Sequence, residues 1–299
     1  PTSQLLSEQN MILVTGSAGK TGQAVIQALI AREAAVRALV HRPAQVQTVE
    51  ALGAQEVAVG DMRVRVTMDQ AARGVRAIYH ICPNMNPDEV AIGQIAIASA
   101  RAAGVEHFVY HSVLHPQTEA MPHHWQKLRV EEMLFESGLP YTILQPAAYM
   151  QNVLAYWDQI LERQIYPVPY SVNTHLGMVD LEDVALAAAN VLTNSGHEGA
   201  TYELAGADVL TQIDLARTLS KQLGRVIRAE TVPIDVWARQ ARASGLGDYQ
   251  VEALIKMFRY YERYGFWGNH NTLSWLLRRP PTTFAAFVRR TVQERLGKK

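Results

Sequence analysis

The segment Thr15–Gly22 carries the residues best suited to bind a ligand, with three glycines spaced three residues apart in Thr-Gly-Ser-Ala-Gly-Lys-Thr-Gly. The first, Gly16, would permit a tight turn, and the second, Gly19, would let the backbone approach a pyrophosphate. The third, Gly22, would let a helix pack closely against a strand. Because free N–H groups at the start of a helix favour phosphate, this spacing predicts a dinucleotide site. The predicted contact residues are Gly16, Ser17, Ala18, Gly19, Lys20, Thr21 and Gly22.

The same letters contain a rival motif, because Gly19-Lys20-Thr21 resembles the end of the phosphate loop of nucleoside triphosphatases. That loop needs a glycine five residues before Gly19, where this chain has Val14 inside a predicted strand. A phosphate-binding loop cannot form while the strand continues. The dinucleotide interpretation is therefore favoured.

The end of the next predicted strand, Val36–Val40, indicates which dinucleotide is bound. No acidic residue, which would hold the ribose 2′-hydroxyl of NAD, occurs from Val36 to Val46. Arg37, His41 and Arg42 stand there instead, and a guanidinium can grip a 2′-phosphate with two hydrogen bonds. We expect Arg42 to be the main ligand and NADP(H) to be preferred over NAD(H). The alternative for Arg42 is a solvated loop cation.

Apolar runs and helical spacing alternate through the first half of the chain. The predicted strands are Met11–Thr15, Val36–Val40, Val57–Val59, Ala77–Ile81, His107–Ser112 and Tyr141–Leu144. The predicted helices between them are Thr21–Ala31, Glu89–Ala103 and Trp125–Ser137. This alternation predicts an α/β fold with a doubly wound parallel sheet.

After about residue 206 the pattern becomes mostly helical. The predicted helices there are Thr211–Leu223, Pro233–Ala243, Asp248–Tyr264 and Thr283–Leu296. The first begins with a Thr cap followed three residues later by Asp214, as in a capping box. We therefore expect a smaller, mostly helical C-terminal portion built against the sheet.

Composition and charge exclude several classes of protein. The 299 residues include 28 Lys and Arg and 28 Asp and Glu, so the basic surplus of a general nucleic-acid binder is absent. The longest apolar run, Val184–Leu192, has about half the roughly 20 residues that span a bilayer, so no membrane association is expected. Residues 1–10 lack a basic signal region and are expected to form a flexible tail. A single cysteine, Cys82, excludes an internal disulfide, and a soluble cytoplasmic protein is expected.

Several segments together resemble the NmrA-like family of atypical short-chain dehydrogenase/reductases, from about Met11 to Gly206. They read ILVTGSAGKTG, ALVHRP, GDM, HFVYHSVLHP, HHWQKLRVEEML, SGLPYTILQPAAYMQN and MVDLEDVA. The combination of SGLPYTILQP, Asn152 and VDLEDVA is the most specific. The C-terminal helical third matches this family only weakly.

The resemblance implies a Rossmann domain of residues 11–155 and 178–206, and a substrate-binding portion of residues 156–177 and 207–299. The family includes NAD(P)H-dependent reductases of the quinone oxidoreductase and triphenylmethane reductase types, so the implied substrate is a quinone-like or other conjugated, aromatic small molecule. It also includes regulators that bind dinucleotide without known turnover. An NADP(H)-sensing regulator with a protein partner is therefore the alternative function. A homodimer is a further possibility.

Lys127 matches the lysine of this family, whose ammonium would hold the nicotinamide ribose. The alternative is a surface lysine paired with Glu131 one helical turn on. Many short-chain reductases place Tyr four residues before the Lys as a proton donor, but here that residue is His123, and no Tyr-x-x-x-Lys occurs in the chain. His123 could donate a proton, although it follows Pro122 in an expected polar loop and would be exposed there. The missing Tyr favours acceptors such as quinones, whose oxygens can take protons from solvent.

Further cofactor contacts are expected where predicted strands end, because ligands of open α/β sheets bind at the carboxyl ends of the strands. The resemblance places Asp61 and Met62 beside the adenine. The other strand-end candidates are Cys82, Pro83, Ser112, Pro146 and Asn152. Gln145 stands where the family commonly has Arg.

Two groups of residues, one of histidines and one of aromatic side chains, do not indicate a single function. His107, His111 and His115 are four residues apart, but on a strand that spacing spans about 13 Å, so no metal site is expected. Residues 256–275 are rich in aromatic side chains, which could stack on a flat acceptor, build a helical core or face a partner. They are Phe258, Tyr260, Tyr261, Tyr264, Phe266, Trp267 and Trp275.

Overall fold

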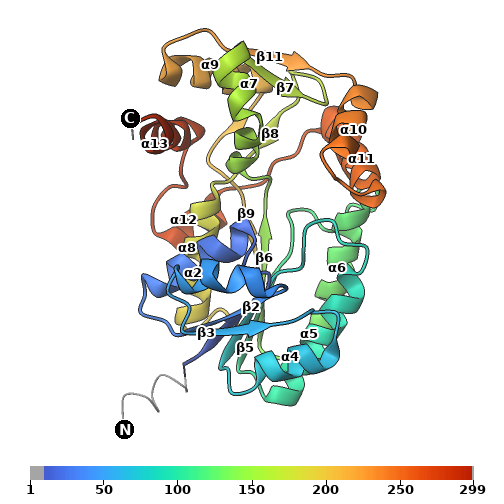
Figure 1. The fold of residues 1–299 in the computed structure, drawn as a ribbon, viewed down its shortest axis with the longest axis vertical. Helices are drawn as coiled ribbons and strands as arrows, with labels where there is room; N and C mark the ends of the chain where they lie inside the picture. Colours follow the sequence, from blue (N-terminus) through green and yellow to red (C-terminus); the bar gives the residue numbers. More distant parts are fainter. Residues whose placement is uncertain (1–9, 298–299) are drawn as a thin grey trace. The chain divides into compact units, whose positions relative to one another are not determined.

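The computed structural model describes residues 10–297, shown in Figure 1. The expected tail therefore lies outside the described residues except for Asn10. The chain forms two compact units. The first contains the chain up to Thr118 with His123–Gln145 and Val184–Tyr202, and the second contains Glu119–Pro122, Pro146–Asp183 and the chain from Glu203 on. Residues 119–122, 146–155, 178–183 and 203–206, which we grouped with the sheet domain, thus belong to the second unit.

A seven-stranded sheet dominates residues 10–297, in the order β3-β2-β1-β4-β5-β6-β9. The strands are β1 Ile12–Val14, β2 Val36–Val40, β3 Glu56–Val59, β4 Ala77–His80, β5 His107–His111, β6 Tyr141–Pro146 and β9 Ala200–Leu204. Every pair from β3 to β6 is parallel. Strand β1 pairs with β2 on one side and β4 on the other, so Val14 lies between Ala38 and Tyr79. The strand order reverses at β1, and such a switch point is where open α/β sheets bind ligands.

Helices cover both faces of this sheet, so the predicted doubly wound fold is confirmed (Figure 1). They are α2 Lys20–Ile30, α3 Val46–Glu50, α4 Arg65–Ala72, α5 Glu89–Ala103, α6 Pro122–Phe135 and α8 Leu181–Thr193, with the short 3-10 helix Pro43–Gln45 after β2. Met68, Ala96 and Val130 of α4, α5 and α6 are buried in one cluster with Leu13 and Phe108 of the sheet. Strands with apolar residues on both faces are buried in this way because helices cover both faces of the sheet.

The second unit is mostly helical, as predicted. Its helices are the 3-10 helix Met150–Tyr156, α7 Trp157–Arg163, α9 Gln212–Leu223, α10 Ile234–Ala243, α11 Asp248–Tyr264, α12 Asn271–Leu277 and α13 Phe284–Leu296. The capping box at the start of α9 is present, with Thr211 Oγ1 accepting from Asp214 N at 3.2 Å and Thr211 N donating to Asp214 Oδ2 at 3.0 Å. The structure adds four short strands, β7 Ile165–Val168, β8 Leu176–Gly177, β10 Val209–Leu210 and β11 Arg228–Thr231.

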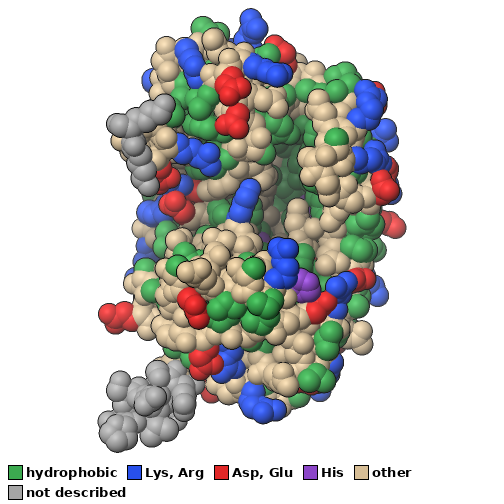
Figure 2. All heavy atoms as spheres, viewed as in Figure 1, with side chains coloured by type: hydrophobic (Ala, Val, Ile, Leu, Met, Phe, Trp, Pro, Cys, Tyr) green, Lys and Arg blue, Asp and Glu red, His purple; other side chains and the backbone are tan. Residues whose placement is uncertain are grey.

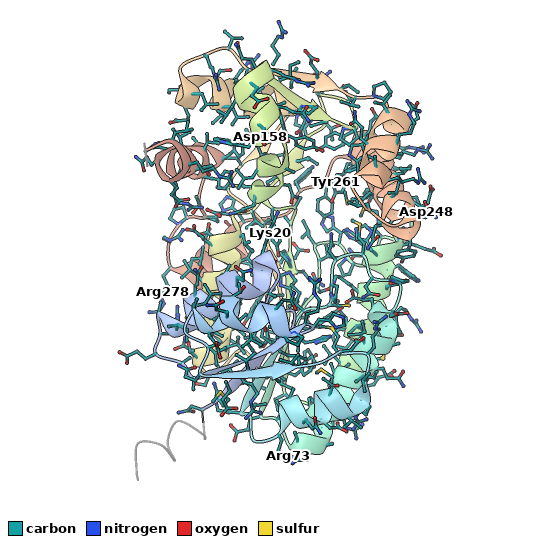
Figure 3. The ribbon with its side chains drawn as sticks, in the orientation of Figure 1. Lys20, Arg73, Asp158, Asp248, Tyr261 and Arg278 are labelled. Atoms are coloured by element: carbon teal, nitrogen blue, oxygen red, sulfur yellow. The ribbon has the colours of Figure 1, made fainter. Side chains whose placement is uncertain are left out.

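The aromatic residues of 256–275 divide between the core and the surface of the second unit. Tyr261, labelled in Figure 3, is buried and stacks on Phe266 with ring centroids 4.7 Å apart. Tyr264, Trp267 and Trp275 are exposed. The core interpretation therefore holds for part of the cluster, and the other rings lie at the surface.

The surface in Figure 2 shows Lys and Arg side chains interspersed with Asp and Glu rather than gathered by sign. In the described part of the chain, no helix is both long and apolar enough to cross a bilayer.

Candidate dinucleotide and reaction site

The glycine-rich loop lies between β1 and α2, and two of its glycines are required by close contacts. Gly16 has a φ of 59°, and a Cβ there would lie 2.8 Å from Ile81 Cγ2 and 2.9 Å from the Ile81 carbonyl oxygen. A Cβ on Gly22 would lie 2.4 Å from the Gly16 carbonyl oxygen. The loop can therefore turn beside β4, and α2 can begin directly against it, only with glycine at both positions.

The start of α2 presents free hydrogen-bond donors. Gly19 precedes the helix without a side chain to cap it, and its first turn contains no acidic residue. The first N–H groups of a helix have no intrahelical partner and carry the positive end of its dipole. Lys20 is exposed at this end of the helix (Figure 3). A pyrophosphate would find unpaired N–H groups and a lysine there.

The other loop residues support this backbone shape. Ser17 is buried and donates its hydroxyl to the Val14 carbonyl at 2.6 Å. The Ala18 carbonyl accepts a hydrogen bond from Gln23 Nε2 at 2.8 Å, and Thr21 is buried. These contacts fix the loop from inside, as does the Gly19 N–H, which donates to the Gly16 carbonyl at 3.0 Å, and they leave Gly19 and Lys20 exposed.

Two arginines follow or occupy β2, and only one has a free guanidinium. Arg37 Nε contacts Glu56 Oε2 at 2.6 Å, and its Nη1 atom donates to the Ala71 and Arg73 carbonyls at 2.7 Å. Arg42 is exposed, and within residues 10–297 its guanidinium has no hydrogen-bond or ion-pair partner. Of the two, Arg42 is therefore the one available to an anionic ligand.

Asp61 and Met62 follow β3 and are both half-buried. Arg63 donates to both carboxylate oxygens of Asp61, with Nη2 to Oδ2 at 2.7 Å, and these bonds hold the pKa of Asp61 below its usual range. The carboxylate charge is thus balanced by Arg63 on the same turn.

Cys82 and Ser112 follow β4 and β5 and are both buried, whereas Pro83 is exposed. Burial raises the pKa of the Cys82 thiol well above its usual range, so it stays protonated and is not a nucleophile. Pro146 and Asn152 belong to the second unit, where Pro146 ends β6 and Asn152 is exposed in the 3-10 helix Met150–Tyr156. The structure therefore places Cys82 and Ser112 at the carboxyl ends of neighbouring strands in the first unit.

Lys127 lies in a buried polar network and is not a surface lysine. Its Nζ atom lies 3.0 Å from Glu89 Oε1, 3.2 Å from the His111 carbonyl oxygen and 5.2 Å from the ring centroid of Tyr110. The Tyr110 hydroxyl donates to the same Glu89 oxygen at 2.7 Å. Burial favours the neutral acid, but the Lys127 ammonium and the Tyr110 hydroxyl outweigh it and hold the pKa of Glu89 below its usual value.

The expected alternative partner of Lys127, Glu131, makes different bonds. Glu131 is buried, accepts from the Ser112 hydroxyl, and accepts from Gln145 Nε2 at 2.9 and 3.0 Å. Burial raises the pKa of Glu131, and the hydrogen bonds from these two neutral donors offset that effect only in part. Gln145 thus uses its amide to bind a buried carboxylate.

The expectation that His123 is exposed in a polar loop is wrong. It lies in the first turn of α6 and is only 8 % exposed, because Pro122 starts the helix instead of preceding it. Burial and the Lys127 charge lower the pKa of His123 to about 4, so the imidazole is neutral near pH 7. Its Nδ1 atom is buried without a partner.

Two more histidines, His80 and His111, are buried and are the last residues of β4 and β5. His80 Nδ1 lies 3.1 Å from Thr15 Oγ1, and His111 Nδ1 lies 2.5 Å from the Tyr79 hydroxyl. Burial lowers their pKa values to about 4 and about 3. His107 and His111 lie on a strand, as predicted. Among residues 10–297, no group of three or more potential ligands is placed to hold a metal ion.

Glu89 and Tyr110 are the residues that sequence reasoning missed. Glu89 was identified only as the start of a helix, and Tyr110 only as part of a strand. The sequence did hold a signal for Glu89, because this residue begins a helix that follows a strand. Such a helix start lies near the carboxyl ends of the strands, where ligands bind.

Comparison with known proteins finds similar chains among proteins named as oxidoreductases and reductases. A quinone oxidoreductase of Escherichia coli strain K12 is 31 % identical over 282 residues, covering 93 % of this chain and 97 % of that protein. An NAD(P)H azoreductase of Xenophilus azovorans is 28 % identical over 281 residues, covering 93 % and 97 %. The structure of an E. coli NADPH-dependent quinone oxidoreductase in complex with NADPH superposes with a TM-score of 0.83, at 30 % identity, over 94 % of this chain and 99 % of that one.

The family resemblance extends beyond the segments that first indicated it. The model of the NmrA-like family matches residues 8–288, which includes the helical C-terminal portion. The glycine-rich loop and the Lys127 network thus lie within a match over almost the whole chain. The protein belongs to the NmrA-like family.

Proposed function

We propose that this protein is an NADP(H)-dependent oxidoreductase that reduces a quinone-like or otherwise conjugated small molecule by hydride transfer. The observation that carries the proposal is the presence, in one unit, of a glycine-rich loop with free helix N–H groups and a buried lysine whose position is fixed by three neighbours. The similar quinone oxidoreductase and azoreductase support it, because both are named as reductases.

The residues present fit a phosphorylated dinucleotide, since Gly16 and Gly22 let the loop turn tightly at the start of α2 and Arg42 is unpaired. In the proposed complex the loop holds the pyrophosphate, Arg42 the 2′-phosphate, and Lys127 the nicotinamide ribose. The remaining proposed contacts in this unit are Asp61, Met62, Cys82, Pro83 and Ser112.

Lys127 has one donor left for the ribose. An ammonium has three N–H bonds, and two of them point to Glu89 and to the His111 carbonyl. The third is free to donate to a ribose hydroxyl. Glu89 holds the ammonium in position, so Lys127 would act by positioning the cofactor, which supplies the hydride.

The proton chemistry of the site favours acceptors that need no positioned acid. No Tyr stands four residues before Lys127, and His123, which occupies that position, is neutral near pH 7. The Tyr110 hydroxyl is fully buried, and burial raises its pKa. A quinone can take its protons from solvent after the hydride arrives, whereas a simple ketone needs an acid in place during transfer.

The experiment is NADPH oxidation by purified protein with a panel of quinones and a panel of simple ketones. We expect turnover with the quinones and little with the ketones. Lys127→Ala should reduce turnover and weaken NADPH binding, whereas Lys221→Ala, a change at an exposed lysine of α9, should not. His123→Ala should leave turnover within about tenfold, because a required general acid contributes 10²–10⁴.

The regulator alternative predicts a different outcome of the same experiment. A sensor would bind NADP(H) and oxidise no acceptor in the panel. That result would overturn the reductase proposal and favour a protein that signals the state of its cofactor.

A further inference from the structure

A cavity of about 360 Å³ lies in the second unit, between the loop 171–175 and the end of α11 with the residues that follow it. Its lining residues are Ser171, Asn173, Thr174, His175, Glu262, Arg263, Tyr264, Gly265 and Trp267. Small-molecule sites have volumes of roughly 300–1,000 Å³, so a ligand of one or two rings fits. None of these residues is among the proposed cofactor contacts.

Hydrogen bonds fix both sides of the cavity. The Ser171 N–H donates to Glu262 Oε1 at 2.9 Å, which ties the loop to α11. The Thr174 N–H donates to the Ser171 carbonyl at 3.0 Å and closes the loop on itself. The Phe266 N–H donates to the His175 carbonyl at 3.0 Å. The cavity is thus preformed, which lowers the entropy cost of binding.

Two glycines, Gly265 and Gly177, lie close to the side chain of Trp267. Gly265 has a φ of 70°, and a Cβ there would lie 3.1 Å from the His175 carbonyl oxygen and 3.6 Å from two atoms of the Trp267 ring. A Cβ on Gly177 would lie 2.9 Å from Trp267 Cβ. Side chains at these positions would fill the cavity or move Trp267, so both glycines keep the site open.

The aromatic faces of the cavity remain in solvent. Tyr264 is 59 % exposed and Trp267 is 54 % exposed, although both are large and largely apolar. The guanidinium carbon of Arg263 lies 5.1 Å from the ring centroid of Tyr264. Flat aromatic rings offer stacking surfaces, and a guanidinium beside one adds a charge that recognises carboxylate or sulfonate.

The unpaired polar side chains of the cavity can all donate hydrogen bonds. In the part of the chain that the structure describes, the side chains of Arg263, His175 and Asn173 have no hydrogen-bonding partner, and Thr174 Oγ1 is buried without one. The carboxylate of Glu262, by contrast, is held by the Ser171 N–H. These donors and the Arg263 guanidinium can bind an anion, whereas the Glu262 carboxylate on the same lining is bonded to the loop backbone.

We propose that this cavity binds a planar aromatic molecule that carries a carboxylate or sulfonate. The ring stacks on Trp267 and Tyr264, and the anionic group accepts hydrogen bonds from Arg263 and the Thr174 hydroxyl. The proposal does not rest on the reductase function, because it concerns binding and involves no hydride transfer.

The test is calorimetric titration of the full chain with naphthalene-2-sulfonate and with naphthalene-2-sulfonamide, its uncharged analogue of similar shape. We expect one binding site and about tenfold tighter binding of the sulfonate, the size expected for a charge-assisted hydrogen bond. Arg263→Gln should remove the difference between the two probes. Arg259→Gln, at an exposed arginine one turn earlier on α11 and outside the cavity, should preserve it.

A second pair of variants tests the stacking surface. Trp267→Leu should weaken both probes, whereas Trp275→Leu, at a tryptophan 62 % exposed and outside the cavity, should leave both unchanged. The surface change Arg263→Gln keeps the test valid if Trp267→Leu fails to fold. Equal affinity for the two probes, no binding of either, or unchanged binding to folded Arg263→Gln would overturn the proposal.

Discussion

The ammonium of Lys127 lies 3.0 Å from the carboxylate of Glu89, and both side chains are almost completely buried, at 11 % and 4 % exposed. The two residues come from α6 and α5, on the face of the sheet that α4, α5 and α6 cover. A buried ion pair is costly to break by removing one partner, since the other charge is then left uncompensated. Glu89 is therefore the residue on which the position of Lys127 depends.

Glu89→Gln should weaken NADPH binding and lower stability. The amide can still accept hydrogen bonds from Lys127 and Tyr110, but it carries no charge to balance the ammonium. We expect unfolding free energy to fall by roughly 1–3 kcal/mol, the cost of leaving a buried charged group poorly paired. Asp88→Asn is the matched control, because Asp88 is the preceding residue and is 48 % exposed. Urea unfolding and NADPH titration of both variants check this, and equal behaviour would contradict the assigned role.

Arg42→Ala should remove most of the preference for NADPH over NADH. The guanidinium has no protein partner in the described residues, so its loss should cost cofactor affinity without disturbing a fold contact. The expected loss is roughly 1.5–3 kcal/mol of NADPH binding, as for hydrogen bonds to charged groups. Arg73→Ala, at another exposed arginine of this unit, should change nothing. Equal affinity of the unmutated protein for both cofactors would refute the prediction.

Two glycine substitutions should separate binding from folding. A Cβ at position 19 meets one atom within 4 Å, the Gly16 carbonyl oxygen at 3.2 Å, so Gly19→Val should fold but lose NADPH binding. A Cβ at position 22 would lie 2.4 Å from the same oxygen, so Gly22→Ala should lose thermal stability as well. Calorimetry and thermal unfolding distinguish the two effects. Normal NADPH binding by Gly19→Val would mean that the loop does not hold the pyrophosphate.

The folded protein should become less stable as the pH falls from about 6.5 to about 4. His80, His107 and His123 have pKa values near 4 when folded, lowered by burial from the usual 6.5. Between these values the unfolded chain binds more protons than the folded one, so acid favours unfolding. Urea unfolding midpoints measured at pH values above and below 6.5 check this expected loss of stability. His80→Gln should flatten the dependence, whereas the exposed His41→Gln should not. A flat profile in the unmutated protein would contradict the burial of these imidazoles.

The sheet could be predicted because its strands are short apolar runs ending at glycine or polar residues, as in Val36–Val40, which the structure reproduces. Helix ends were also close, since Thr211 and Gly224 mark the start and end of α9. The two-residue strands β8 and β10 carry no periodic pattern and depend on tertiary pairing.

The site was harder to predict because its central contacts join distant residues. Glu89 and Lys127 are 38 positions apart, and only the packing of α5 beside α6 brings them together. His123 was misplaced because proline was taken to precede a helix, whereas Pro122 begins one. The steric roles of Gly16 and Gly22 could be predicted from the sequence, because glycines at this spacing mark positions where the backbone packs too closely for a side chain.

The most direct test of the central claim is anaerobic mixing of the protein with stereospecifically C4-deuterated NADPH and a quinone. The account predicts one quinone reduced per NADPH oxidised, dependent on the protein and slower with one of the two deuterated cofactors than with ordinary NADPH. Tight NADPH binding without oxidation by any quinone would contradict it.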